Sequence, residues 1–435
     1  MNAEDRIDQI VQRLAAEMKQ LAQAAGTGRP PAGMLEYLLR ERLWHFGARF
    51  LEVLWRQAET HLLAGRPVQD RPQKRFLSLF GEVEMPRARC RLTPAGWQYP
   101  LDEALGIDGQ APYTATVQEL LSLLAVQESF ATVAGEVDKL LGLKVSAKSI
   151  QRTAESAGQR AEQQLAQEAA AALAGQPPPP VAEPARDTLV VAMDGVQAPH
   201  RDGWHEVKLA TVFPNEARCR QHGGRRVLTR KGYLATVESA AGFGQRLWAQ
   251  ACRWGADQVG RLVVMGDGAK WIWNLADEHF PQGLQILDFY HAAEHLWKFA
   301  EQAFGDRQQT AATRSWARRY VKYLKRGRVD LVLEAMGRVA GGQRPKRSAA
   351  AQQALEGQIN YVQENRHRMD YPAYRRQGLP IGTGVVEGSC KFVVQARFKK
   401  PGARWSRPGL AALLALKQLW LNQEWNSFWP HLAAA

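Results

Sequence analysis

The 435-residue sequence predicts an α/β protein: a mixed β-sheet with a long helical insertion, preceded by a mainly helical N-terminal region. Three observations predict this class. Apolar residues repeat at helical spacing through residues 1–65, and short apolar runs alternate with helical patterns through residues 188–290. Helical spacing then returns through residues 291–375. A chain of this length is expected to form about two to four domains.

The N-terminal part is predicted to contain helices followed by a small strand-containing segment. Within residues 1–65, Ile7, Ile10, Val11 and Leu14 share one helical face, and residues 35–55 form a longer amphipathic stretch. We expect this helical region to support self-association, although it could equally cover a neighbouring core. Within residues 66–112 the pattern LSLFGEVEMPRARCRL favours a short hairpin between Phe76 and Leu92.

Residues 113–174 are predicted to contain a helix-turn-helix. A helix that ends near Leu141 meets a glycine-containing turn, and Ser146 is placed to cap a second helix that extends through Ala157. One exposed side of this second helix carries residue types that contact bases and phosphates, namely Lys148, Gln151 and Arg152. Helix pairs joined by a short turn are also common outside DNA-binding proteins, so both interpretations stay open.

Four consecutive prolines within residues 175–187 predict an extended linker between domains. After it, the sequence predicts strands over 188–195, 204–213, 232–237, 261–266 and 284–288, with helices before and after the fourth strand. Three meandering strands, a helix, a strand, a helix and a strand is the order of an RNase H-like sheet. Residues 188–290 therefore form the first part of that core, residues 291–375 a helical insertion, and residues 376–435 the closing segment, whose helix begins near Gly384.

The charge predicts a polyanionic partner. The chain has 57 Lys and Arg against 43 Asp and Glu, a net charge of +14, and a surplus of this size favours double-stranded DNA. Two blocks without acidic residues, 314–328 and 391–407, concentrate the surplus. Such blocks also occur as solvated helix faces, but two of them favour a phosphate-binding surface. The candidate DNA contacts in these blocks are Arg314, Arg318, Lys322, Lys391, Arg397, Lys399, Lys400 and Arg404.

Other features predict a cytoplasmic protein without a membrane partner. No apolar run in the sequence is long enough to span a bilayer, and the N-terminus has acidic residues and helical spacing, unlike a signal peptide. The four cysteines are far apart and include no C-x-x-C pair, which fits a reducing compartment.

Two carboxylates follow apolar strands at corresponding positions. Asp194 and Asp267 are each followed by a glycine, which we expect to let the backbone turn sharply as the strand ends. Because the first and fourth strands are neighbours in the expected sheet, the two side chains should converge, and Glu387 from the closing helix would complete a cluster. Three close carboxylates repel one another unless cations lie among them, and their oxygens suit two Mg²⁺ or Mn²⁺ ions. Asp before Gly is also common in simple turns and caps.

Three stretches resemble a known family: VAMDGVQAPHRDGWHEVKLATVF, GDGAKWIWNLADEHFP with LQILDFYHAAEHLW, and IGTGVVEGSCKFVVQARFKKPGARWS. They are similar to the motif blocks of ISKra-type bacterial insertion-sequence transposases, DDE enzymes with an RNase H-like core that are distantly Mutator-like. The resemblance covers most of residues 70–425. It implies Asp194, Asp267 and Glu387 as catalytic, metal-binding residues. A zinc ribbon known in the family is not expected, since Cys90 stands alone in that region.

Asp288 and His291 resemble the Asp-x-x-His signature of Mutator-like enzymes. The resemblance implies that His291 contacts the scissile phosphate or orients a water molecule. The alternative is that Asp288 caps a helix and His291 packs in the core.

Taken together, we expect a divalent-metal-dependent DDE transposase. It would bind element ends and target DNA, as a homodimer or larger assembly. It would cleave the element ends and then transfer the freed 3′-hydroxyl into target DNA. Three alternatives stay open: a non-catalytic DNA-binding relative, an RNase H-like nuclease without strand transfer, and a zinc metalloprotease. The last would use the H-x-x-E-H pattern of His291, Glu294 and His295.

Overall fold

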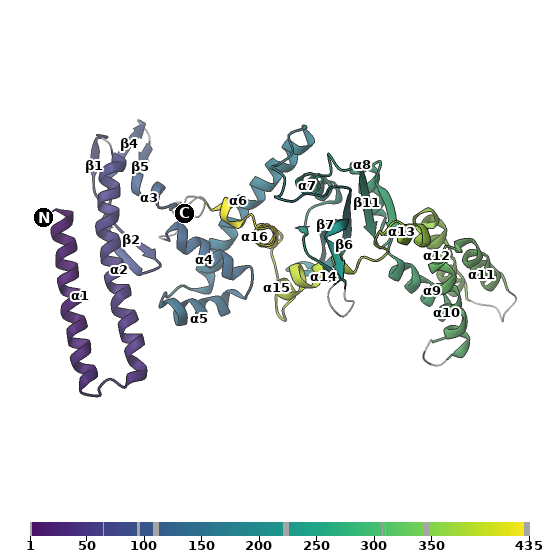
Figure 1. The fold of residues 1–435 in the computed structure, drawn as a ribbon, viewed down its shortest axis with the longest axis horizontal. Helices are drawn as coiled ribbons and strands as arrows, with labels where there is room; N and C mark the ends of the chain where they lie inside the picture. The colour runs from purple at the N-terminus through teal and green to yellow at the C-terminus, as the bar shows by residue number, and fades with distance from the viewer. Residues whose placement is uncertain are drawn as a thin grey trace. The chain divides into compact units, whose positions relative to one another are not determined.

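The computed structural model describes residues 2–63, 65–93, 96–107, 113–220, 226–306, 308, 310–342 and 348–429. The last residues of the expected strand-containing segment (108–112) and of the closing segment (430–435) lie outside the described residues. The chain divides into two compact units (Figure 1). Unit 1 comprises Met1–Ala157 and Trp425–Ala435, and unit 2 comprises Gly158–Glu424. This division falls within a helix, whereas the proline-rich stretch 175–187 lies inside unit 2.

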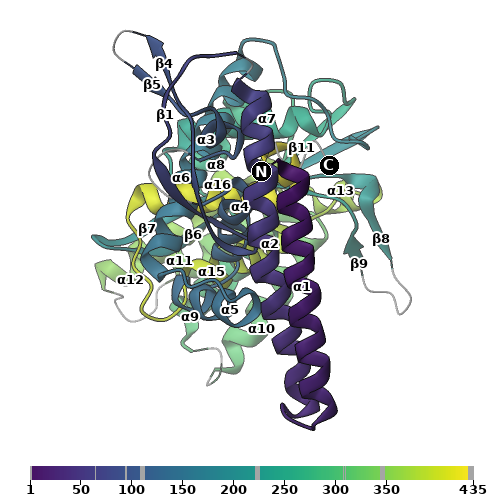
Figure 2. The same ribbon diagram turned by 90° about the vertical axis from the view of Figure 1, so that its left-hand side faces the viewer.

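Unit 1 begins with two long helices that pack side by side, α1 (Ala3–Gly26) and α2 (Ala32–Leu63) (Figure 2). Asn2 and Asp5 form a reciprocal capping box at the start of α1. The predicted hairpin is confirmed, with β2 (Gln73–Ser78) paired to β3 (Gly81–Pro86). A second small sheet was not predicted: β1 (Val68–Asp70), β4 (Arg89–Thr93) and β5 (Gly96–Gln98), in the order β1-β4-β5.

Helices complete the described part of unit 1: α3 (Pro100–Ala104), α4 (Ala115–Ala125), α5 (Phe130–Leu141), the start of α6 (Ala147–Leu173) and α17 (Trp425–Phe428). Helix α5 ends as predicted, at Gly142 with a left-handed φ of +67°, and Ser146 Oγ accepts from the Ser149 N–H. Helix α6 extends beyond the predicted Ala157, because its alanine-rich continuation favours helix. In unit 2, ion pairs fix this continuation, with Arg246 bonded to Glu162 and Arg253 to Glu168.

Unit 2 is built on a five-stranded mixed sheet with the order β10-β7-β6-β11-β12. The strands are β6 (Thr188–His200), β7 (Gly203–Pro214), β10 (Gly232–Thr236), β11 (Arg261–Gly266) and β12 (Leu284–Leu287). The first three are antiparallel neighbours, and β11 runs parallel to both β6 and β12. Helices α7 (Ala240–Arg253) and α8 (Lys270–His279) flank β11 in sequence. The predicted mixed sheet and element order are therefore confirmed. A short ladder between β8 (Arg218–Arg220) and β9 (Arg226–Leu228) was not predicted.

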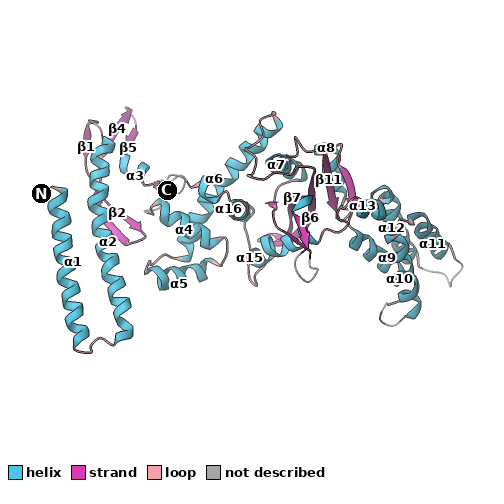
Figure 3. Ribbon diagram, in the orientation of Figure 1, coloured by secondary structure: helices cyan, strands magenta, loops and turns pink. Residues whose placement is uncertain are grey.

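The helical insertion is also confirmed, as the secondary-structure colouring of Figure 3 makes plain. It contains α9 (Phe289–Phe304), α10 (Ala311–Lys325), α11 (Val329–Gly341), α12 (Ala349–Glu364) and α13 (Tyr371–Arg376). The chain then returns to the sheet through α14 (Gly384–Ser389), which packs against β6 and β7. A π-helical turn (Cys390–Gln395), α15 (Ala396–Phe398) and α16 (Arg407–Leu421) follow. None of the described helices combines the length and apolar character needed to cross a membrane.

Candidate active site

Asp194 lies in the middle of β6 and not at its end, so the predicted sharp turn after it is wrong. Antiparallel pairing with β7 continues from Asp194 to His200, which holds the backbone extended. Parallel pairing with β11 stops at Ala192, however, so Asp194 lies just beyond the end of that neighbouring strand. The glycine that follows leaves room for the Glu206 side chain, since a Cβ on Gly195 would come within 2.2 Å of Glu206 Oε1.

Asp267 directly follows the end of β11, as predicted. Its Oδ1 accepts a hydrogen bond from the Ala269 N–H at 3.0 Å, and Gly268 turns the chain with a φ of +101°. Its backbone oxygen accepts from the Tyr361 hydroxyl at 2.7 Å, which anchors the turn to α12. Ala269 is the residue that precedes the first turn of α8, so the Asp267 side chain stabilises a turn without capping the helix itself.

Asp267 lies close enough to Asp194 to raise its pKa. Burial is the main cause that raises the pKa of Asp194, and the negative charge of Asp267 raises it further. Hydrogen bonds from the Gly195 N–H at 2.7 Å and the Cys390 thiol at 3.5 Å act in the opposite direction, as does the nearby His291. Asp267 and His291 are therefore both near enough to Asp194 to act on its pKa.

Glu387 lies on α14, the helix that packs over Asp194, but its side chain is exposed. Its carboxylate forms an ion pair with Lys391 at 2.8 Å. Cys390, one turn further on, donates to Asp194, and burial raises the pKa of this thiol with help from Asp194 and Glu387. In the part of the chain that the structure describes, no three Asp, Glu, His or Cys side chains converge as they stand into a group that could hold a metal.

Asp288 is a buried structural residue that links two elements of the site. Its Oδ1 accepts from the N–H groups of Tyr290 and His291 at 2.5 and 2.9 Å, which caps α9. Its Oδ2 accepts from both the N–H and the hydroxyl of Thr383, the residue before α14. Of the two interpretations of Asp288 and His291, capping holds for Asp288. His291 is not packed in the core, since 41% of its side chain is exposed.

The H-x-x-E-H segment does not present a free pair of zinc ligands. The His295 ring stacks on Tyr361 with centroids 3.5 Å apart, and its Nδ1 lies 2.7 Å from Gln358 Oε1. Burial is the main cause that lowers the pKa of His295. Glu294 is paired with Lys298 at 3.1 Å. Glu294 and His295 are thus engaged with neighbouring side chains, while His291 is partly exposed.

The predicted basic contacts of unit 2 fall into two groups. Arg318, Lys322, Lys391 and Arg404 are exposed, while Arg314, Lys399 and Lys400 are half-buried. Arg397 differs, because its guanidinium is buried 5.0 Å from the centre of the Trp405 ring. Its predicted place on a phosphate-binding surface does not fit this burial. The charge of a basic block does not specify which of its cations faces the core, and Arg397 is the one that packs beside Trp405.

On the predicted DNA-contacting side of α6, in unit 1, hydrogen bonds connect neighbouring side chains into a row. Lys148 Nζ lies 3.2 Å from Gln151 Oε1, and Gln151 Nε2 lies 2.7 Å from Glu155 Oε1. Lys148 and Arg152 are exposed. The row is therefore accessible, and its side chains hold one another in place.

Two functional features could not be found from the sequence. Thr383 carries no local signal for its bond to Asp288, and Cys390 carries none for its bond to Asp194. A hydroxyl or thiol just before or within a helix is too common to indicate such a contact.

Comparison with known proteins identifies the family of the chain. The model of the Uncharacterised protein family (UPF0236) matches residues 56–424. A protein described as "UPF0236 protein in vanSb 3'region", from Streptococcus gallolyticus, is 31% identical over 102 residues. That match covers 22% of this chain and 23% of the relative, so the chain is aligned to about a quarter of that protein's length. Since the family model spans most of the sequence, the chain belongs to the UPF0236 family.

Proposed function

We propose that this protein is a DDE transposase with an RNase H-like catalytic sheet, acting on double-stranded DNA. The observation that carries the proposal is the pairing of Asp194 and Asp267 across the neighbouring parallel strands β6 and β11. Two carboxylates held near each other against their electrostatic repulsion are typical of sites that bind cations. The resemblance of the surrounding motifs to insertion-sequence transposases supports the same function.

The donor set fits Mg²⁺ or Mn²⁺ in part. Asp194 and Asp267 supply hard oxygen ligands, and a cation between them would relieve the repulsion that helps to raise the pKa of Asp194. Glu387 would complete the set after its carboxylate exchanges Lys391 for the metal. Its exposure leaves room for that rotation. When bound, two such ions lower the pKa of a water molecule and stabilise the charge of a phosphodiester under attack.

The chain's own residues would position the DNA and the protons. His291 is partly exposed and close to Asp194, so it can donate a hydrogen bond to a phosphate oxygen or accept a proton from an attacking water. Lys391, released from Glu387, would remain beside the cleaved strand. Asp288 acts as a positioning residue, because it fixes both His291 and the start of α14.

The remaining basic surfaces would hold the duplex. Exposed cations on α10 and after α14 are suited to phosphate contacts: Arg318, Lys322, Lys391 and Arg404. Helices α5 and α6 would act as a helix-turn-helix that holds element ends through Lys148, Gln151 and Arg152. Helices α1 and α2 would mediate self-association, since synapsis of two ends requires at least a dimer.

The test is Mn²⁺-dependent strand cleavage of the DNA that flanks this gene, with wild type compared to Asp267→Asn. Asparagine keeps the Oδ1 that accepts from Ala269 but removes the charge that a metal requires. Asp277→Asn is the matched control, because Asp277 is an exposed residue on α8. We expect cleavage at a defined end by wild type and the control, and loss of cleavage in Asp267→Asn. Equal cleavage by all three would refute the proposal.

The same reaction separates transposition from simple hydrolysis. A supercoiled plasmid is added as target, and joined products are separated on a gel. Cleavage followed by joining of the 3′-end supports a transposase, whereas cleavage without joining under all metal conditions supports an RNase H-like nuclease that uses the same carboxylates.

A further inference from the structure

A basic pocket in unit 2 is lined by none of the three predicted carboxylates and by none of the individual DNA contacts named above, although Lys325 and Arg326 belong to the basic block 314–328. It has a volume of about 740 Å³ and lies between the start of α9, the end of α10, α13 and the segment that leads to α14. Five of the ten described residues that line it are Lys or Arg, and none is Asp or Glu. A pocket whose lining contains several cations and no carboxylate is suited to phosphate groups.

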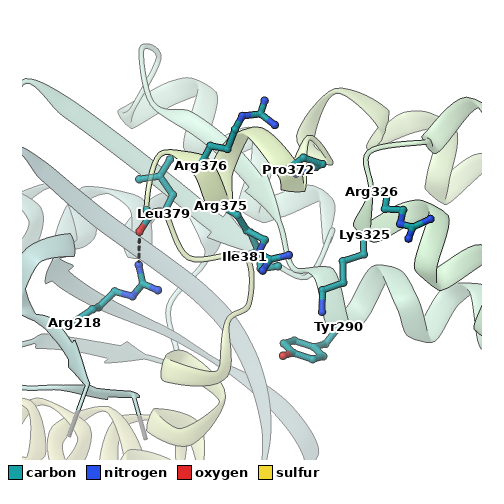
Figure 4. Close-up of a pocket in the computed structure, with 10 residues that line it drawn as sticks. Arg218, Tyr290, Lys325, Arg326, Pro372, Arg375, Arg376, Leu379 and Ile381 are labelled. Atoms are coloured by element: carbon teal, nitrogen blue, oxygen red, sulfur yellow. Dashed lines mark hydrogen bonds between the residues drawn. The ribbon is translucent and has the colours of Figure 1, made fainter. Parts of the chain in front are cut away.

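Two of these cations face an exposed tyrosine. In Figure 4, the side chains of Lys325 and Arg375 extend toward the space in front of Tyr290. Another cation, Arg218, is held at the pocket edge by a bond of 2.9 Å to the Gly378 backbone oxygen. The pocket is thus assembled from segments that are distant in sequence.

Tyr290 is placed as a stacking surface. It is 70% exposed, although it lies between the buried Asp288 cap and the body of α9. One edge of its ring rests against Gly382, where an added Cβ would come within 2.8 Å of Tyr290 Cε2. The backbone therefore supports the ring from one side and leaves much of it open. An exposed aromatic ring beside cations is typical of sites that bind single-stranded nucleic acid.

The pocket also adjoins the candidate active site through the chain itself. Tyr290 is the neighbour of His291, which influences the charge of Asp194. Ile381, which lies two residues before Thr383, accepts a hydrogen bond at its backbone oxygen from the Phe289 N–H at 2.8 Å. The pocket and the candidate active site therefore share the start of α9 and the segment that leads to α14.

We propose that this pocket binds an unpaired segment of the DNA strand next to the cleavage site. Lys325 and Arg375 contact its phosphates, and Tyr290 stacks on one of its bases. The inference rests on the proposed function for the identity of the nucleic acid. Beyond that function, it implies that the base pairs beside the cleaved bond are separated in the complex.

The experiment measures binding without cleavage, by fluorescence anisotropy of the full chain in EDTA over a range of salt. The probes are a labelled 15-nucleotide single strand and the duplex of the same sequence. Lys325→Gln with Arg375→Gln should weaken single-strand binding about tenfold and reduce the slope of log affinity against log salt by about 1.4. Tyr290→Ala should weaken it by about 5- to 150-fold with an unchanged slope, because stacking involves no counterions.

Control variants separate these effects from general charge and folding. Lys19→Gln with Arg338→Gln removes the same charge from exposed positions on α1 and α11, and should bind like wild type. Tyr290→Phe keeps the ring and should also bind like wild type. Thermal unfolding confirms that each variant is folded.

Three results would overturn the inference: wild type does not bind the single strand, the pocket variants bind as wild type does, or duplex binding falls as much as single-strand binding. Failure of the proposed function is distinguishable. It would appear as absence of Asp267-dependent cleavage, whatever the binding measurement gives.

Discussion

Replacing Asp288 with alanine should destabilise unit 2 and reduce DNA cleavage together. The Asp288 side chain is 2% exposed and accepts four hydrogen bonds, two from the N-terminus of α9 and two from Thr383. Loss of a helix cap costs about 1 kcal/mol. A buried N–H of Thr383 left without an acceptor costs about 1–3 kcal/mol more.

The combined loss is about 3 kcal/mol, which corresponds to a melting temperature lower by roughly 6–12 °C for a unit of this size. Burial of a carboxylate has a desolvation cost that alanine would remove. We expect the four hydrogen bonds to exceed that cost, since bonds to a charged acceptor contribute about 1.5–3 kcal/mol each. Two assays are needed. Differential scanning calorimetry measures the melting temperature of unit 2, and the cleavage reaction measures activity.

Asp288→Asn separates the cap from the link to α14. Asparagine keeps an oxygen for the Tyr290 and His291 N–H groups but places an amide donor opposite Thr383. It should therefore lose less stability than alanine, while cleavage falls in both because α14 and Glu387 lose their anchor. A melting temperature of Asp288→Ala equal to or above that of wild type would refute the reasoning, as would full cleavage by either variant.

The remaining predictions concern a buried charge and a strained turn. Burial, with Arg397 nearby, lowers the pKa of Lys417 to about 8 from 10.5. The folded state thus binds fewer protons than the unfolded state between these pH values, so stability is lowest below pH 8 and recovers toward pH 10.5. Lys417→Met should raise the unfolding free energy by about 3 kcal/mol at pH 7. Urea titrations should show that this gain in stability vanishes by about pH 10.5. A difference in stability that does not change with pH would contradict the prediction. Gly268→Ala places a Cβ 2.6 Å from the Tyr361 ring at a left-handed φ, so we expect a loss of about 1–3 kcal/mol and reduced cleavage, and unchanged thermal unfolding would contradict this.

The sequence by itself determined the main strands of the five-stranded sheet, the helical insertion and their order, but not the two small ladders β1-β4-β5 and β8-β9. The alternating and continuous apolar runs that predict the strands, and the helical spacing of residues 291–375, are local patterns, so they are readable without the fold. The turn after Asp267 was also predicted from its Asp-Gly pair, but the same pair at Asp194 does not turn the chain, so the pair alone does not decide where a strand ends. The neighbouring positions of the first and fourth strands followed from the element order, and with them the approach of Asp194 to Asp267.

Only the tertiary structure decided how distant segments meet. The length of β6 depends on its pairing with β7, so Asp194 proved to be mid-strand although its local sequence resembles a strand end. The bond between Asp288 and Thr383 likewise depends on a partner 95 residues away. The burial of Arg397 depends on how the segment up to Trp405 packs. Periodicity specifies which face of an element is apolar, but the neighbour that covers that face is chosen by packing of the whole unit. For that reason the basic pocket around Tyr290 has no signature in any one stretch of the sequence.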